Sequence, residues 1–374
     1  MTLKRFAAAA VAAGLLVAPA AASAAETVTI GFTAALSGDF AAFGLNMRKG
    51  LDLAVKALNA KGGTTYEVVS ADDRGEAREG VLIAQRFCSD DKIDVVMGYS
   101  FSSIALAAVP VFDECKLPVL ASAVTSPDLS GASAYFRRNV LTDAVQGAMM
   151  GTYAAETLGL KKIYVLNQQD DYGIGVAGAF SAAAKEAGAE IVGEEAYLLG
   201  AKDFRTMLTK VRSAAPDAIF IGGFYTEAAK IAEQARALGI TAQILSTDGA
   251  LNPELMTLGR DAVEGMIVYG MFDPSVATVT TEAFLKDYTA AYNEAPSAWA
   301  ALGYDAGMTL AAAVTLAEAK GPVTRESLNT AFGELKDVPG VTGPTTFDAS
   351  GDRAGALYFL VVKDGGFKLA PKQP

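Results

Sequence analysis

The sequence predicts an α/β protein built from two doubly wound lobes, each a parallel sheet with helices on both faces. From residue 26 to about residue 270, short β-rich runs alternate with amphipathic stretches. The runs are almost continuously apolar, which is typical of parallel strands that are buried on both faces. The chain of 374 residues also exceeds what one hydrophobic core usually supports, and its hydrophobic fraction of 51% excludes general disorder.

The first residues have the features of a secretory signal peptide. Lys4 and Arg5 precede an apolar run over residues 6–17, and residues 22–24 (Ala-Ser-Ala) fit the small-x-small pattern of a cleavage site. We therefore expect residues 1–24 to be removed and the product to be periplasmic. The alternative is a membrane anchor, but the run is shorter than the roughly 20 residues that span a bilayer. No later segment is expected to span a membrane.

The first βα series begins at residue 28. Met47, Leu51, Ala54 and Leu58 recur at helical spacing and form one apolar face. Strands are expected over residues 28–32, 66–70, 93–97 and 118–121, and helices over residues 43–60, 76–89 and 102–114.

A second series follows without a composition change that would mark a domain boundary. Helices are expected over residues 143–157, 173–187, 203–213 and 226–238, and strands over residues 163–166, 190–197, 217–221, 243–245 and 266–269. Beyond residue 270, two Ala-rich helices are expected over residues 281–292 and 298–319, followed by a Gly/Pro-rich stretch at 338–344 and a strand over 357–362.

The charge balance and the absence of histidine exclude several classes of function. Without Lys4 and Arg5, 29 basic residues stand against 42 acidic ones, a net charge of −13, which disfavours nucleic acid as a partner. The chain has no histidine, so imidazole-based triads and zinc-peptidase motifs are excluded. We expect no catalytic residue, no metal and no cofactor.

Two cysteines, Cys88 and Cys115, fall near the ends of neighbouring predicted helices. An exported location permits them to pair, and closing this loop would stabilise the fold by about 3 kcal/mol in the chain-entropy model. The alternative is two inert buried thiols.

Gly173, Gly175 and Gly178 spell G-x-G-x-x-G at the start of a predicted helix, as in a dinucleotide-binding site. Six residues are expected between the preceding strand and Gly173, whereas the fingerprint needs a tight turn directly after the strand. Asp170 and Asp171 would also repel a pyrophosphate. The motif therefore favours a structural role.

Polar and aromatic residues follow several predicted strands. Ser102 begins a helix, where free backbone N–H groups favour a carboxylate, and Thr125 follows the next strand. Asp248, Tyr172 and Phe224 follow strands of the second series. Each has a plainer alternative as a helix cap, a turn residue or a packing residue. Ligands of open α/β sheets bind outside the carboxyl ends of the strands, so their shared position indicates a binding site.

Several segments together resemble the periplasmic leucine/isoleucine/valine-binding proteins of ABC transporters over nearly the whole mature chain. The segments are Ile30-Gly31, residues 35–38 (Ala-Leu-Ser-Gly), Phe43-Gly44, residues 58–63 (Leu-Asn-Ala-Lys-Gly-Gly), Asp72-Asp73, residues 96–98 (Val-Met-Gly), Ser102-Ser103, residues 170–173 (Asp-Asp-Tyr-Gly), residues 222–224 (Gly-Gly-Phe), Gly343-Pro344 and Phe347-Asp348.

The resemblance implies a type I periplasmic binding protein, whose lobes are joined by a three-strand hinge. Lobe 1 would then comprise residues 25–141 and 272–347, and lobe 2 residues 142–271 and 348–374. The resemblance also implies a monomer that works with a permease in the inner membrane.

The same resemblance implies roles for individual residues. Ser102 and the Thr125 backbone would bind a ligand carboxylate. The Ala123 carbonyl, the Thr125 hydroxyl and Asp248 would hold its ammonium, and Tyr172 would reach across from lobe 2. Two positions depart from the pattern, because Phe43 and Phe224 lack the hydroxyl or indole usual there, and Asp248 is shorter than the usual Glu. The complete expected set is Phe43, Phe101, Ser102, Ala123, Thr125, Tyr172, Phe224 and Asp248.

We therefore expect a receptor that closes around a small amino acid, with branched-chain or other apolar side chains favoured. Relatives that bind aromatic acids keep that ligand class open. An exported α/β enzyme using Asp248 or Asp171 as a base, and a sensor domain feeding a signalling partner, are the alternatives from other classes.

Overall fold

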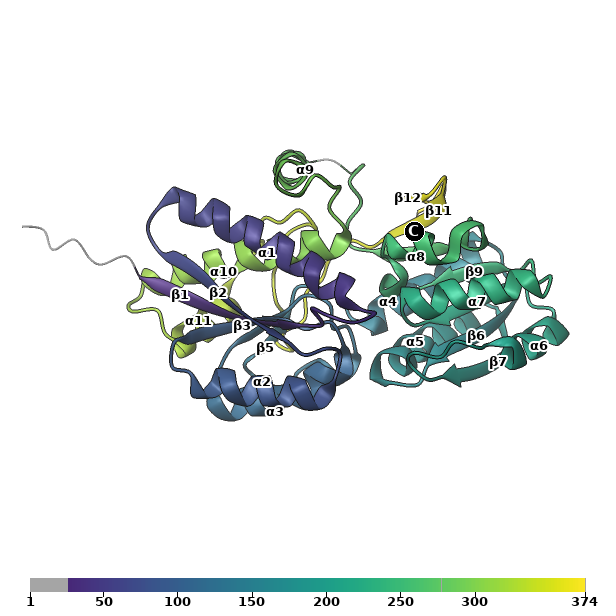
Figure 1. Cartoon of the computed structure of the whole chain (residues 1–374), viewed down its shortest axis with the longest axis horizontal. Coiled ribbons are helices and arrows are strands. Elements are labelled where there is room, and N and C mark those ends of the chain that lie inside the picture. The colour runs from purple at the N-terminus through teal and green to yellow at the C-terminus, as the bar shows by residue number, and fades with distance from the viewer. Residues whose placement is uncertain (1–25, 277, 374) are drawn as a thin grey trace, which may run out of the picture.

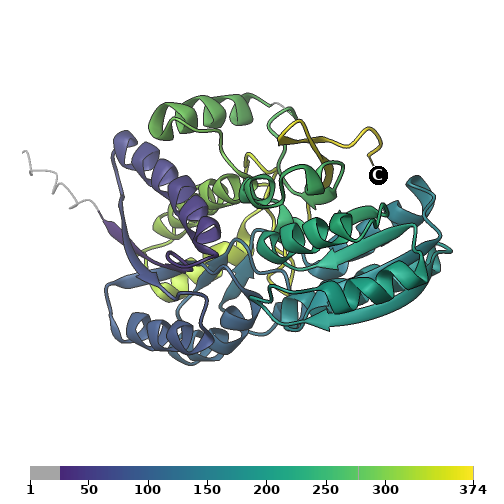
Figure 2. The same ribbon diagram turned by 45° about the vertical axis from the view of Figure 1, so that its right-hand side comes forward.

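The computed structural model describes residues 26–276 and 278–373, so the expected signal peptide lies outside the described residues. Two α/β lobes lie side by side along the long axis of the molecule (Figures 1 and 2). The first lobe holds a five-stranded sheet of order β2-β1-β3-β4-β5, and the second a seven-stranded sheet of order β12-β11-β10-β9-β8-β6-β7. All pairs of the first sheet are parallel, as expected for a doubly wound lobe.

The elements of the first lobe follow the expected alternation. Three of the four expected strands are one to three residues longer than expected, the fourth is one residue shorter, and a fifth short strand and a last helix were not expected. Its strands are β1 (Thr27–Ala34), β2 (Thr65–Asp72), β3 (Ile93–Gly98), β4 (Val119–Ala121) and β5 (Phe136–Arg138), and its helices are α1 (Ala41–Lys61), α2 (Ala77–Ser89), α3 (Ser102–Cys115), α9 (Val279–Tyr292), α10 (Ala298–Glu318) and α11 (Arg325–Glu334).

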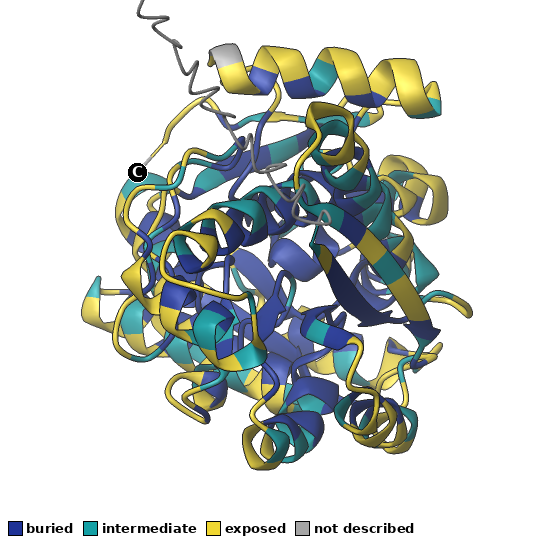
Figure 3. Ribbon diagram, turned by 90° about the vertical axis from the view of Figure 1, so that its left-hand side faces the viewer, coloured by how far each residue is buried: buried dark blue, intermediate teal, exposed yellow. Residues whose placement is uncertain are grey.

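The second lobe continues the alternation and ends in an antiparallel hairpin at the edge of its sheet. Its strands are β6 (Lys162–Gln168), β7 (Glu190–Tyr197), β8 (Ala218–Gly222), β9 (Gln243–Ser246), β10 (Ile267–Gly270), β11 (Tyr358–Lys363) and β12 (Gly366–Leu369), and its helices are α4 (Asp143–Thr152), α5 (Asp171–Glu186), α6 (Arg205–Ala214), α7 (Tyr225–Ala237) and α8 (Glu254–Gly259). Figure 3 shows buried strands inside and exposed outer faces on the helices.

The chain passes between the two sheets three times, after β5, after β10 and before β11. These crossings are bonded to one another, since the Leu141 N–H lies 3.2 Å from the Met271 sulfur and the Arg353 guanidinium donates to the Asn139 carbonyl at 2.9 Å. Asp352 is paired with Arg138 of lobe 1 at 2.7 Å, so the last crossing follows Arg353.

Helix α10 lies against α1 in the core of the first lobe (Figure 1). Their close approach depends on glycine, because a Cβ on Gly303 would stand 2.1 Å from the Met47 carbonyl oxygen and one on Gly50 only 1.9 Å from that of Ala300. The prediction that no later segment is long and apolar enough to span a membrane was wrong. Among the described residues, α10 has the length and the apolar composition of a membrane-spanning helix. However, 67% of its most apolar stretch is buried inside the protein.

The structure joins Cys88, at the end of α2, to Cys115, at the end of α3, in a disulfide whose Cα atoms are 5.8 Å apart. The bond therefore links two neighbouring helices on one face of the first sheet, as the pairing alternative predicted.

The G-x-G-x-x-G segment lies within a helix. The expected six-residue gap was wrong, since β6 runs on to Gln168 and α5 begins at Asp171, so Gly173 belongs to the first helical turn. A Cβ on Gly173 would stand 2.3 Å from the Gln168 carbonyl oxygen, which explains glycine there by close packing of helix against strand.

Candidate ligand-binding site between the lobes

Residues from both lobes enclose one small cavity at the carboxyl ends of the strands. Its volume is about 10 Å³, close to that of one water position. The lobe 1 part follows β1, β3 and β4 and includes the start of α10, and the lobe 2 part follows β6, β8 and β9. The lining residues are Phe43, Ser100, Ser102, Ala123, Tyr172, Phe224, Asp248, Gly249 and Trp299. Six of the eight expected residues therefore meet at one place.

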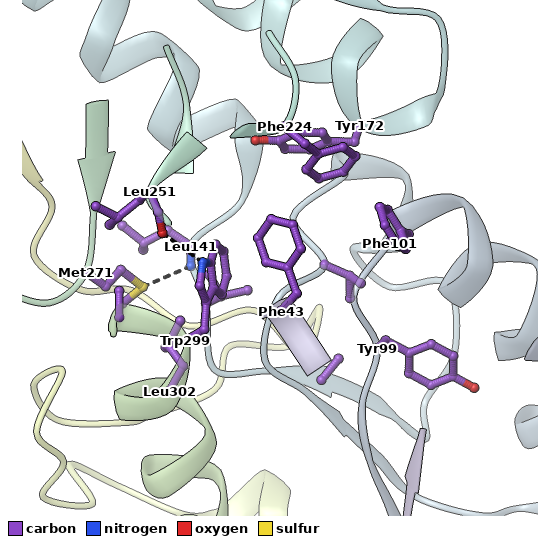
Figure 4. Packing of buried hydrophobic residues seen from close by; sticks show 14 of the residues in the cluster. Phe43, Tyr99, Phe101, Leu141, Tyr172, Phe224, Leu251, Met271, Trp299 and Leu302 are labelled. Carbon is purple, nitrogen blue, oxygen red and sulfur yellow. Dashed lines mark hydrogen bonds between the residues drawn. The ribbon is translucent and has the colours of Figure 1, made fainter. Parts of the chain in front are cut away.

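Aromatic rings from the two lobes form the walls of this site. Phe43 lies at the centre, with its ring centroid 5.6 Å from that of Phe224 and 5.3 Å from that of Trp299 (Figure 4). Phe101, which does not line the cavity, closes one side with its ring edge-on to Phe224 at 5.0 Å. Tyr172 stacks on the other face of Phe224, also at 5.0 Å. The cage is suited to an apolar side chain or a flat ring.

Asp248 is the acidic group of the cavity, and it is held by its own lobe. One carboxylate oxygen accepts hydrogen bonds from the Tyr172 hydroxyl at 2.7 Å and the Gly249 N–H at 2.8 Å, and the other accepts from the Gln146 amide at 3.1 Å. Burial raises the pKa of Asp248, while the hydrogen bonds from Tyr172 and Gln146 act in the opposite direction. The Tyr172 hydroxyl orients the Asp248 carboxylate, and Tyr172 also lines the cavity.

Ser102 and Thr125 are arranged differently from the expectation. The Thr125 N–H donates to the Ser102 hydroxyl oxygen at 3.2 Å, so this backbone donor is already bonded. The Ser126 N–H donates to the same oxygen at the same distance. With its oxygen accepting twice, the Ser102 hydroxyl keeps its own proton free to donate. The first N–H groups of α3 and this hydroxyl therefore supply donors for an anion.

Several hydrogen bonds and ring contacts join the lobes directly. The Trp299 indole N–H donates to the Leu251 carbonyl at 3.0 Å, and the Tyr225 hydroxyl donates to the Asp39 carbonyl at 2.7 Å. Figure 4 shows Trp299 reaching from lobe 1 toward Leu251 of lobe 2. These contacts hold the cleft closed over Asp248.

Several residues of this region were missed from the sequence, among them Gly249, which lines the cavity. Ser100 and Trp299 line the cavity, and Gln146 and Asp143 lie behind Asp248 in the first turn of α4. Gln146 and Asp143 are fully buried polar residues three positions apart at the start of a helix. That spacing places both on one helix face, which is the signal that could have indicated them.

Comparison with known proteins gives the class of the fold and of the site. The periplasmic binding protein family profile matches residues 27–366. The Leu/Ile/Val-binding protein BraC3 of Rhizobium johnstonii is 31% identical over 91% of this chain and 92% of its own. The branched-chain amino acid transporter substrate-binding protein LivJ of Streptococcus pneumoniae, solved with isoleucine, is 32% identical with a TM-score of 0.86, covering 93% of this chain and all of its own.

A solute-binding protein of an R. palustris ABC transporter, solved with benzoate, has a TM-score of 0.84 over 92% of this chain and 95% of its own. At 21% identity it supports the fold alone. The chain thus belongs to the periplasmic binding protein family, and its solved relatives are substrate-binding proteins of ABC transporters.

Proposed function

We propose that this chain is the exported receptor of an ABC importer, which captures an amino acid between its lobes and delivers it to a permease in the inner membrane. The observation that carries this proposal is the position of Asp248, a buried carboxylate that faces the Ser102 side of lobe 1 across a cavity closed by both lobes. A zwitterionic ligand fits this polarity, with its carboxylate at the start of α3 and its ammonium at Asp248.

The ligand side chain would then lie in the aromatic cage of Phe43, Phe224 and Trp299, which favours an apolar amino acid. The names of relatives that bind branched-chain amino acids agree with this assignment. Charge-assisted contacts of about 1.5 to 3 kcal/mol each would be sufficient for micromolar binding after the costs of association. A receptor needs no chemistry, and without histidine the chain lacks the commonest general base.

Aromatic carboxylates are the second ligand class, because the ring cage suits them and a structural neighbour was solved with benzoate. Asp248 argues against them. An acid without an amine would bring a second negative charge next to a buried carboxylate and offer it no donor.

The proposal is tested by thermal shift with ligand-stripped mature protein, the twenty amino acids and a set of aromatic and aliphatic carboxylates. A ligand at about 100 times its Kd adds about 2.7 kcal/mol to the stability of the native state. We expect one group of apolar amino acids to raise Tm by several degrees and to be recovered chemically unchanged by mass spectrometry. Shifts with aromatic acids alone would contradict the amino-acid assignment, and turnover would contradict the receptor function.

A further inference from the structure

We propose that an apolar pocket beside the chain crossing after β10 is a second ligand site, and that an uncharged, ring-containing small molecule bound there stabilises the closed form. The pocket shares no lining residue with the cleft cavity, and its volume is about 270 Å³. A dry apolar cavity of about 150 Å³ is sufficient for benzene, so this pocket can hold one ring with a short substituent. The coupling to the cleft rests on the proposed function, whereas the site itself does not.

Both lobes form this pocket, which we call the hinge pocket. Leu251 and Leu360 of lobe 2 line it, as do Phe272 and Ala298 of lobe 1, and Phe272 lies on a chain crossing two residues after β10. These four residues are buried. Other lining residues, such as Pro253, are exposed, so the pocket is open to solvent. Because residues of both lobes line it, its shape depends on how the lobes are placed relative to each other.

The lining of the hinge pocket favours a ligand without charge. Apart from Asp273 and Ser297, every lining residue is apolar or glycine. Asp273 already accepts a hydrogen bond from the Ser275 N–H at 2.8 Å, and Ser297 caps α10 by accepting from the Ala300 N–H at 3.2 Å. None of the described residues that line the pocket is basic, so an anion finds no partner. A cation would lose hydration among the apolar side chains.

Two half-buried side chains explain why a ring is the expected ligand group. Met256 of α8 and Phe367 of β12 line the pocket, and each keeps part of its apolar surface in water. A ligand that covers them removes that surface from water. Aromatic rings pack favourably edge-on or offset on phenylalanine, and the methionine sulfur gains further from contact with a ring.

The hinge pocket is connected to the cleft through two of its residues. Leu251 and Ala298 also line the small gap next to Asp248, together with Trp299. The Leu251 carbonyl accepts the hydrogen bond of the Trp299 indole, and Figure 4 shows Leu251 beside Trp299 and Met271. A molecule that packs on Leu251 and Ala298 in the hinge pocket would therefore contact both lobes where they are hydrogen-bonded to each other.

Binding in the hinge pocket should strengthen amino-acid binding in the cleft. A ligand that contacts both lobes in the closed form loses part of these contacts when the lobes separate, so it favours the closed form. The amino acid favours the same form. By linkage, each ligand then raises the affinity for the other by the same factor.

The site is tested with three probes that share one ring: benzyl alcohol, which is uncharged, benzoate and benzylamine. Ligand-observed NMR titration of the full mature protein, free and with the cleft filled by the amino acid that gives the largest thermal shift, measures their Kd values. With the cleft filled, benzyl alcohol should bind at least tenfold more tightly than the two charged probes. Met256→Lys should lose at least tenfold in this affinity, because it places a charge in the pocket. Met207→Lys, at a half-buried methionine of α6 outside the pocket, is the matched control.

The coupling is tested by calorimetry of the amino acid with and without saturating benzyl alcohol. Its affinity should rise at least fivefold in wild type and in Met207→Lys, and should not change in Met256→Lys. An unchanged affinity in wild type would refute the coupling.

The outcomes separate the hinge pocket from the proposed function. Failure of benzyl alcohol to bind, or equal binding by Met256→Lys, would refute the site, and tighter binding of either charged probe would refute the ligand class. If no amino acid binds, the proposed function and the coupling fail, while titration of the free protein still decides the site. The measurements on wild type need no variant, so they decide even if Met256→Lys folds poorly.

Discussion

Asp248 is the residue on which the ligand assignment depends most directly. We expect Asp248→Ala to weaken amino-acid binding at least tenfold, which corresponds to about 1.4 kcal/mol, because the ammonium loses its partner and Tyr172 and Gln146 lose their acceptor. Calorimetry against Asp261→Ala, an exposed aspartate of the same lobe, gives the measurement and its control. Equal affinity in the two variants would rule out the ammonium role.

At the scale of residues, the sequence indicated those site residues that directly follow a predicted strand. Ser102, Phe224 and Asp248 were found because each follows a strand, and the carboxyl ends of parallel strands meet at one edge. Trp299 begins a helix beyond the βα series, and Asp143 begins one directly after a hinge crossing. The helix of Trp299 follows another helix, and the helix of Asp143 follows β5, a short strand that the sequence analysis did not predict, so only the packing of distant segments brings them to the cleft. The sequence also could not show that the Thr125 N–H donates a hydrogen bond to the Ser102 hydroxyl, because this contact depends on how two separate loops pack.

At the scale of elements, the contact between α1 and α10 positions Trp299 against the site. We expect Gly303→Ala to lower the free energy of unfolding by about 1–3 kcal/mol, because its new Cβ would stand 2.1 Å from a backbone oxygen of α1 and force the helices apart. Chemical denaturation gives the measurement. Gly303→Ala should also weaken ligand binding, because Trp299 lies on α10 and would move with it.

Gly178→Ala is the matched control for that substitution. Gly178 is exposed on α5, and a Cβ there meets no atom within 4 Å. Alanine in a helix is more favourable than glycine by about 0.5–1 kcal/mol, so this variant should be as stable as wild type or more stable. Similar losses in both variants would show that backbone preference, and not the helix contact, sets the effect at Gly303.

The sequence predicted the long elements well and missed short or weakly patterned ones. Buried strands such as β3 and β8 are continuous apolar runs, and the 21-residue helices are long stretches rich in apolar residues, so both could be predicted from the sequence. Strand β5 has three residues and is defined by its pairing with β4, which is a property of the fold. Helix α11 was missed although Leu328, Ala331 and Phe332, its core residues, recur at helical spacing.

At the scale of the whole molecule, closure joins two lobes that the sequence could only place side by side. Tyr225 with Asp39, and Trp299 with Leu251, connect residues 186 and 48 positions apart. No local pattern predicts such pairs. A ligand that touches both lobes adds to these contacts only in the closed form, so binding and closure are coupled through the difference in affinity between the two forms.

The stability of the free protein and the stabilisation caused by ligand should depend on pH in opposite directions. Burial raises the pKa of Asp73 to about 6 and that of Asp143 well above its usual range. At these two groups the native state holds more protons than the unfolded state above about pH 4, so their contribution to the stability of the free protein is greatest below that pH and is lost as pH rises through the folded pKa values. For Asp73 alone the loss is of the order of 2–3 kcal/mol.

Amine binding has the reverse dependence, because an ammonium is favoured by an ionised carboxylate at Asp248. We expect Tm without ligand to fall between pH 5 and pH 7.5, while the Tm increase caused by the amino acid grows over the same interval. Thermal unfolding at several pH values, with and without ligand, measures both trends. Asp143→Asn should weaken the first trend and leave its Asp73 part, whereas a Tm that rises with pH in the free protein would contradict the direction of both buried shifts.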